Sequence, residues 1–185
     1  MSTTQFCNSR QEIASIPVNE LAEQFGTPLY VYDLSVIEKR IAELSRFDVV
    51  RYAQKACGNI AVLDRMRRHG VVVDAVSAGE IHRALTAGYS ADASKAEIVY
   101  TADLFDRAAL EMVVEHGLVV NCGSPDMISQ LGEVRPGAEV TLRINPGFGH
   151  GHSQKTNTGG EQSKHGIWHT QILSLIHISE PTRPY

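Results

Sequence analysis

Short apolar segments alternate with segments of helical spacing through the middle of the chain, and this alternation limits the possible folds more than any other feature. Five segments rich in valine and isoleucine have the pattern of strands that are buried on both faces. The expected strands are 48–54, 71–76, 97–102, 118–122 and 139–146. One strand–helix unit recurs roughly every 20 to 27 residues, which is typical of a parallel α/β sheet.

Helix-start signals support this interpretation. The segments 35–44, 60–69, 77–88, 103–117 and 124–132 are expected to be helical. The expected N-caps are Ser35, Asn59, Ser77 and Ser124. Ser77 and Glu80 have the spacing of a capping box, in which the carboxylate stabilises the first turn, and so do Ser35 and Glu38.

Two architectures produce such a repeat, an open doubly wound sheet and a (β/α) barrel. An open sheet ordinarily carries a glycine-rich nucleotide fingerprint after its first strand. The turn after the first expected strand reads ACGN, and no G-K-[ST] motif occurs. We therefore predict an α/β fold that is a partial TIM-like (β/α) barrel, truncated after about five βα units. Since such barrels have eight strands and about 250 residues, the chain is expected to be an amino-terminal fragment of a longer protein.

Active sites of these barrels lie at the carboxyl ends of the strands. Those ends carry Lys55, Asp74, Ser77, Thr101, Asp103, Asn121, Arg143 and Asn145. An amine at a barrel mouth can form a Schiff base, although a solvated lysine at a strand end is the common alternative. Asp74 lies in an apolar strand and needs a partner, for which Lys55 is a candidate. Arg143 either faces the site or forms an ion pair that only supports the barrel.

Composition and spacing exclude several other classes. The net charge of −4 argues against a nucleic-acid surface, and no apolar run reaches the roughly 18 residues of a membrane helix. Three cysteines without a C-x-x-C motif indicate a cytoplasmic setting. His150, His152, His165 and His169 match no known ligand spacing, so no metal site is predicted. Cys57 is expected to be a small buried cysteine, not a nucleophile.

Several motifs resemble one family in order and separation. They are FGTPLYVYD, RYAQKA, DAVSAGEIHRALTAG, VNCGSPDMISQLG and LRINPGFGHGHSQKTNTGGEQSKHGI. Together they resemble the diaminopimelate decarboxylases, in the alanine-racemase-like barrel group of pyridoxal-phosphate enzymes. The resemblance runs from about Ile16 to Gln171, and the long polar loop is characteristic of the diaminopimelate branch.

The resemblance implies a function and a set of site residues. It implies that Lys55 holds pyridoxal 5'-phosphate as a Schiff base, and that Asp74, Glu80 and Arg143 face the cofactor. The implied reaction is the decarboxylation of meso-diaminopimelate to L-lysine, by an enzyme that is a homodimer at full length. The family usually has asparagine where this chain has Cys57, two residues after the lysine, which affects local packing more than the lysine itself.

Alternative functions remain within the same fold. One is a non-catalytic barrel that binds pyridoxal phosphate, and another is an ornithine or arginine decarboxylase or an amino-acid racemase. The stacking histidine, the phosphate-binding loop and the partner-subunit cysteine that the resemblance implies would follow Gln171 in a longer chain. As it stands, the chain is expected to be inactive.

The resemblance also suggests three segments. Residues 1–27 would be an amino-terminal lead that packs with a carboxyl-terminal β domain, and residues 28–171 the partial pyridoxal-phosphate-binding barrel. Residues 172–185 show no further strand–helix rhythm and resemble the translation of a sequencing adapter. We expect them to be a non-native tail whose removal changes stability little.

Overall fold

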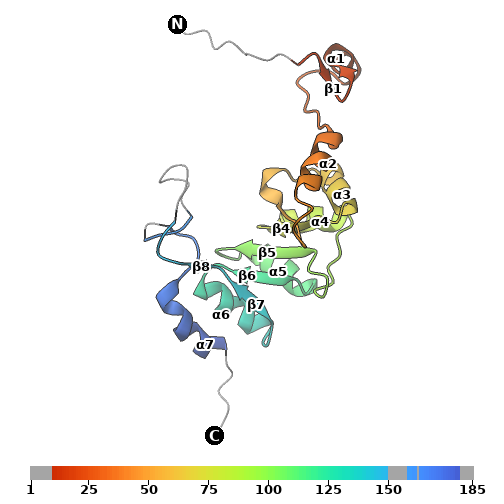
Figure 1. Ribbon diagram of the computed structural model, residues 1–185. Coiled ribbons are helices and arrows are strands. Elements are labelled where there is room, and N and C mark those ends of the chain that lie inside the picture. Colours follow the sequence, from red (N-terminus) through yellow and green to blue (C-terminus); the bar gives the residue numbers. More distant parts are fainter. Residues whose placement is uncertain (1–9, 150–157, 162, 180–185) are drawn as a thin grey trace. The chain divides into compact units, whose positions relative to one another are not determined.

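The computed structural model describes residues 10–149, 158–161 and 163–179. It divides into two compact units, Met1–Asp48 and Val49–Tyr185 (Figure 1). The first unit holds an antiparallel pair, β1 (Glu12–Ile13) and β2 (Ile16–Pro17), and the helices α1 (Val18–Phe25) and α2 (Leu34–Glu43). The predicted divisions after residues 27 and 171 remain predictions.

The second unit is built on a five-stranded sheet. Its strands are β3 (Arg51–Ala53), β4 (Val72–Ala75), β5 (Ile98–Ala102), β6 (Val119–Cys122) and β7 (Val140–Leu142). All neighbours are parallel, and they follow one another in chain order (Figure 1). A doubly wound sheet reverses its strand order at a switch point, whereas a barrel does not. The fold is therefore α/β and part of a TIM-like barrel, as predicted.

Four helices connect these strands. They are α3 (Ile60–Arg68), α4 (Ala78–Thr86), α5 (Arg107–Glu115) and α6 (Pro125–Val134). The expected caps Asn59, Ser77 and Ser124 accept hydrogen bonds from backbone N–H groups of the first turns. Ser35 is not a cap, because α2 begins one residue earlier and Asp33 accepts the bond from the Ser35 N–H.

One face of the sheet packs against the helices and forms the core. The side chains that alternate toward this face are Val73, Ala75, Ile98, Tyr100, Val120 and Cys122, each at most 2% exposed. They pack with buried residues of α3 to α6, including Leu63, Ile81, Val113 and Met127. The side chains between them, such as Asp74 and Asn121, belong to the opposite face and are only half-buried. We expected strands that are buried on both faces. In the described part of the chain, only the face of the sheet that packs against the helices is fully buried.

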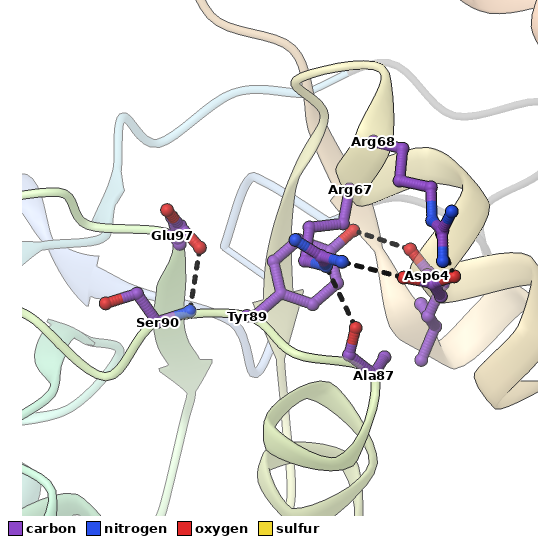
Figure 2. A network of polar contacts seen from close by, with 8 residues as sticks. Asp64, Arg67, Arg68, Ala87, Tyr89, Ser90 and Glu97 are labelled. Carbon is purple, nitrogen blue, oxygen red and sulfur yellow. Dashed lines mark hydrogen bonds and ion pairs between the residues drawn. The ribbon is translucent and has the colours of Figure 1, made fainter.

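A polar network ties the helices to the loops at the amino ends of the strands (Figure 2). Arg67 donates to Asp64 Oδ1 at 2.8 Å and to the Ala87 carbonyl at 3.0 Å. The buried Tyr89 hydroxyl donates to the Leu63 carbonyl at 3.1 Å, and Glu97 accepts from the Ser90 N–H at 2.7 Å. This end of a (β/α) barrel supports stability, whereas the opposite end carries function.

The chain continues after β7 with elements that the sequence did not predict. β8 (Ile144–Asn145) was expected as the end of one long strand, and it pairs in parallel with β9 (Ile167–Trp168) across the polar loop. The 3-10 turn η3 (His169–Gln171) and helix α7 (Ile172–Ser179) follow, and α7 packs on α6. Regular structure thus extends beyond residue 172, into the segment that we expect to be a non-native tail. None of the helices in the described ranges is long and apolar enough to cross a membrane.

Candidate active site

Lys55 lies at the carboxyl end of β3, as we predicted from the sequence. The strand passes into the 3-10 turn η1 (Gln54–Ala56), which closes with a hydrogen bond from the Cys57 N–H to the Gln54 carbonyl. Gln54 is 1% exposed, while Lys55 is exposed. The turn therefore buries Gln54 and leaves Lys55 exposed at the end of β3.

Asp74 lies on the open face of the sheet, between β3 and β5. Its carboxylate accepts a hydrogen bond from the Thr101 hydroxyl at 2.5 Å. Asp74 also affects the pKa of the Arg51 guanidinium. Burial lowers this pKa, and the negative charge of Asp74 offsets part of the effect by raising it. We predicted Lys55 as the partner of Asp74, but within the described residues no ion pair joins them. Thr101 supplies the contact instead.

The open face of the sheet forms a groove of about 510 Å³. Its lining includes Arg51, Ala53, Asp74, Thr101, Asn121 and Thr141. The Thr141 hydroxyl lies 3.2 Å from Asn121 Oδ1, so polar groups from adjacent strands interact along this face. Lys55 is not part of this lining, but it follows two residues after Ala53, which is part of it.

Glu80 has the structural role that its spacing predicts. The Ser77 side chain accepts a hydrogen bond from the Glu80 N–H at 3.3 Å. In return, Glu80 Oε2 accepts from the Val76 N–H at 2.9 Å, one residue before the N-cap. The carboxylate therefore stabilises the start of α4 and is held at the carboxyl end of β4.

Arg143 forms an ion pair at the carboxyl edge of the sheet. Its Nη1 lies 3.3 Å from Oδ1 of Asp103, the residue that follows β5. The other carboxylate oxygen of Asp103 contacts His165 Nδ1, and the Gly166 N–H donates to Oδ1 at 3.4 Å. A helix was expected to begin at Asp103, but α5 begins at Arg107, because Asp106 is its N-cap. Asp103 is thereby free to face this edge.

Sequence reasoning placed Asp103 at a strand end but missed its contacts. Its two side-chain partners lie 40 and 62 residues further along the chain. No spacing rule connects positions so far apart, so only the return of the chain through β8 and β9 reveals them. His169 lies beside Trp168, with ring centroids 5.1 Å apart. His150 and His152 lie outside the described residues.

The two described cysteines differ in environment. Cys122 is buried at the end of β6, and this burial raises the pKa of its thiol to about 11. Cys57 is half-buried, and the Tyr52 hydroxyl donates to its carbonyl at 3.5 Å. The expectation that Cys57 is fully buried is therefore not met.

Comparison with known proteins shows to which family this chain belongs. Residues 34–180 match the family described as pyridoxal-dependent decarboxylase, pyridoxal binding domain. The chain belongs to this family. The match covers all strands of the five-stranded sheet, and so includes Lys55, Asp74 and Arg143.

Individual relatives of the family agree with this result. The chain is 58% identical over 158 residues to diaminopimelate decarboxylase of Escherichia coli K12, which covers 85% of this chain and 38% of that protein. It is 59% identical over 157 residues to diaminopimelate decarboxylase of Streptomyces coelicolor, covering 85% of the chain and 36% of that protein.

Solved structures show the same relationship. A crystal structure of diaminopimelate decarboxylase superposes with a TM-score of 0.81 at 57% identity, over 86% of this chain and 38% of that one. A crystal structure of diaminopimelate decarboxylase from M. jannaschii in complex with L-lysine superposes with a TM-score of 0.75 at 26% identity, over 91% of this chain and 42% of that one. The chain thus spans less than half the length of the relatives it matches.

Proposed function

We propose that this chain forms the cofactor-binding part of a diaminopimelate decarboxylase, which converts meso-diaminopimelate to L-lysine and carbon dioxide with pyridoxal 5'-phosphate. The observation that carries the proposal is the exposed Lys55 at the carboxyl end of β3, the strand whose Arg51 and Ala53 line the groove. The identity of 58% with the Escherichia coli enzyme favours this substrate over ornithine or arginine.

The residues present fit the cofactor. Its aldehyde needs an accessible amine, which Lys55 offers. Its charged groups need fixed partners, and the carboxyl edge of the sheet holds Asp74, Glu80 and Arg143, each in a hydrogen bond that orients it. When bound, pyridoxal phosphate supplies a conjugated ring that accepts the electron pair released as carbon dioxide leaves.

Each residue has a defined task in this proposal. Lys55 would bind the cofactor aldehyde and place it over the groove. Asp74, held by the Thr101 hydroxyl, would keep a negative charge beside that amine, and Arg143 would present its guanidinium to an anionic group. Glu80 has one oxygen on the Val76 N–H and a second oxygen with which to face the cofactor. Fixed groups of this kind orient a bound molecule at little entropic cost.

Borohydride reduction tests the proposal directly. The chain is incubated with pyridoxal phosphate, reduced and digested, and the labelled peptide is identified by mass spectrometry. The expected label is on Lys55, and Lys55→Arg should remove it together with the visible absorbance of the bound cofactor. Lys95→Arg is the matched control, since Lys95 is an exposed lysine outside the site. A label on Lys39 or Lys95 in the unaltered chain would overturn the assignment.

Substrate choice is tested on the cofactor-loaded chain. Meso-diaminopimelate should change the cofactor absorbance at lower concentration than ornithine or arginine do. An equal response to all three would favour a non-catalytic binding protein or a sister decarboxylase. The homodimer and the cytoplasmic setting also belong to this proposal, and sedimentation of a full-length relative's purified subunits tests the first of them.

A further inference from the structure

The Asp103 carboxylate joins three segments of the chain at the carboxyl edge of the sheet. Asp103 follows β5, Arg143 follows β7, and His165 and Gly166 precede β9. Oδ1 accepts from Arg143 Nη1 at 3.3 Å and from the Gly166 N–H at 3.4 Å, while Oδ2 accepts from His165 Nδ1. One carboxylate thus serves three donors that lie far apart in the sequence.

The space around this carboxylate depends on two glycines. A Cβ at Gly123 would overlap the Asp103 carboxylate and the Ala102 carbonyl, and it would lie 2.8 Å from Asp103 Cα. Gly166 has a φ of +80°, and a Cβ there would lie 3.1 Å from the Arg143 carbonyl. Larger residues at either position would displace the carboxylate or its partners.

The surrounding backbone holds the partners in place. The Arg143 N–H donates to the Cys122 carbonyl at 2.9 Å, and the Ile167 N–H donates to the Arg143 carbonyl at 2.8 Å. These bonds fix the main chain of Arg143 but not its guanidinium. Asp103 is 26% exposed in its side chain and Arg143 31%, so water screens the pair only in part. The side-chain direction of Arg143 therefore depends on Asp103.

An ionised carboxylate only accepts hydrogen bonds, so the contact also fixes the histidine ring. Whenever the His165 ring is neutral, its single proton must therefore lie on Nδ1, which leaves Nε2 as an acceptor. Arg143 uses Nη1 for Asp103 and keeps its other N–H groups for a ligand. The same carboxylate thus sets the direction of a cation and the tautomer of an imidazole.

We propose that Asp103 is a positioning residue, which fixes the Arg143 guanidinium and the His165 tautomer at the carboxyl edge of the sheet. The proposal rests on the proposed function only in taking pyridoxal phosphate as the ligand that benefits. Asp103 itself touches Arg143, His165 and Gly166, and acts through them.

Asp103→Asn tests this role because the amide has one oxygen where the carboxylate has two. If that oxygen takes the place of Oδ1, the NH₂ group faces His165 Nδ1 and the tautomer reverses. If the amide oxygen faces His165 instead, then Arg143 and the Gly166 N–H lose their acceptor. One of two readouts must therefore change in the cofactor-free chain: the ¹⁵N shifts of the His165 ring, or the hydrogen exchange rate of the Gly166 amide. Glu111→Gln is the control, since it removes the exposed Arg107–Glu111 pair on α5.

A second arm uses pyridoxal phosphate as the probe. Asp103→Asn should weaken its binding, followed by absorbance, by about tenfold, the effect of one lost hydrogen bond to a charged group. Unchanged ¹⁵N shifts and exchange rates in Asp103→Asn would overturn the positioning role. Absence of label on Lys55 in the unaltered chain, with the cofactor-free readouts as expected, would overturn the proposed function and leave the positioning role standing.

Discussion

The Thr101 hydroxyl donates a hydrogen bond to Asp74 Oδ1 at 2.5 Å, across the ladder between β5 and β4. This bond satisfies a carboxylate that the sequence places in an otherwise apolar strand. The contact lies on the open face of the sheet, in the groove of the candidate site.

Replacing this hydroxyl is expected to lower stability. Thr101→Val keeps the shape of the side chain but leaves the half-buried Asp74 without its donor, which should cost about 1 to 2 kcal/mol of unfolding free energy. Thr141→Val, on the same face, is the control, because its hydroxyl makes only longer contacts, at 3.2 and 3.4 Å, to neutral oxygens. Urea unfolding measures both. Equal losses in the two variants would show that the Asp74 contact has no special weight.

Two glycines near α6 should respond to alanine in opposite directions. Gly123→Ala places a Cβ against the Ala102 carbonyl and Asp103, and overpacking of this kind costs about 1 to 3 kcal/mol. Gly132 lies inside α6, and a Cβ there meets nothing within 4 Å. Gly132→Ala should therefore raise stability by about 0.5 to 1 kcal/mol, because alanine favours the helix. Thermal unfolding of the pair checks the signs, and a stabilised Gly123→Ala would contradict the geometry.

Alkaline pH is expected to destabilise the second unit. Burial raises the pKa of the Tyr89 and Tyr100 hydroxyls from near 10 to about 12, and that of the Cys122 thiol from near 9 to about 11. Between these values the unfolded chain loses protons that the folded chain keeps, so the folded state is favoured fully below about pH 9. Its stability falls as the pH rises from about 9 to about 12.

Tyr100→Phe should make this decline shallower, since it removes one titrating group and keeps the ring stacked on Phe105 at 5.1 Å. Tyr30→Phe is the control, because that ring is 88% exposed. The measurement is the unfolding free energy at a series of pH values from 8 to 11. A decline of the same steepness in Tyr100→Phe as in the unaltered chain would contradict the assignment.

Two leucines in α7 test whether the end of the chain belongs to the fold. Leu175 is 4% exposed, whereas Leu173 is 75% exposed. Leu175→Ala should cost about 2 to 3 kcal/mol through the cavity it leaves, and Leu173→Ala less than about 0.5 kcal/mol. Thermal or urea unfolding distinguishes them. If neither variant differs from the unaltered chain, residues 172–185 are a tail without a structural role, as their sequence suggested.

Local signals in the sequence determined most of the framework. Apolar runs of strand length fixed the five parallel strands, and side chains such as Asn59, Ser77 and Ser124 fixed the starts of three helices, because a cap acts within three residues of itself. The same logic placed Lys55 and Arg143 at the carboxyl edge, since parallel strands bring their ends to one side of a sheet. These predictions needed no knowledge of distant contacts.

Competition between neighbouring signals was harder to judge. Asp33 and Ser35 can both cap α2, and Asp103 and Asp106 can both precede α5. Which residue acts depends on where the preceding segment is held, so the sequence misplaced both helix starts. For α5, the predicted start at Asp103 lies four residues before the observed start at Arg107.

Tertiary structure alone decided the partners of the polar groups. Asp74 bonds to Thr101, not to Lys55, and Asp103 joins Arg143 to His165 across 40 and 62 residues. β9 is only two residues long and forms because β8 is there to pair with it. The hydrogen-bond partner of a side chain is the closest suitable donor or acceptor in space. In a sheet of parallel strands, that group lies on another strand or on a loop that returns to the sheet. No local sequence pattern can specify such a partner.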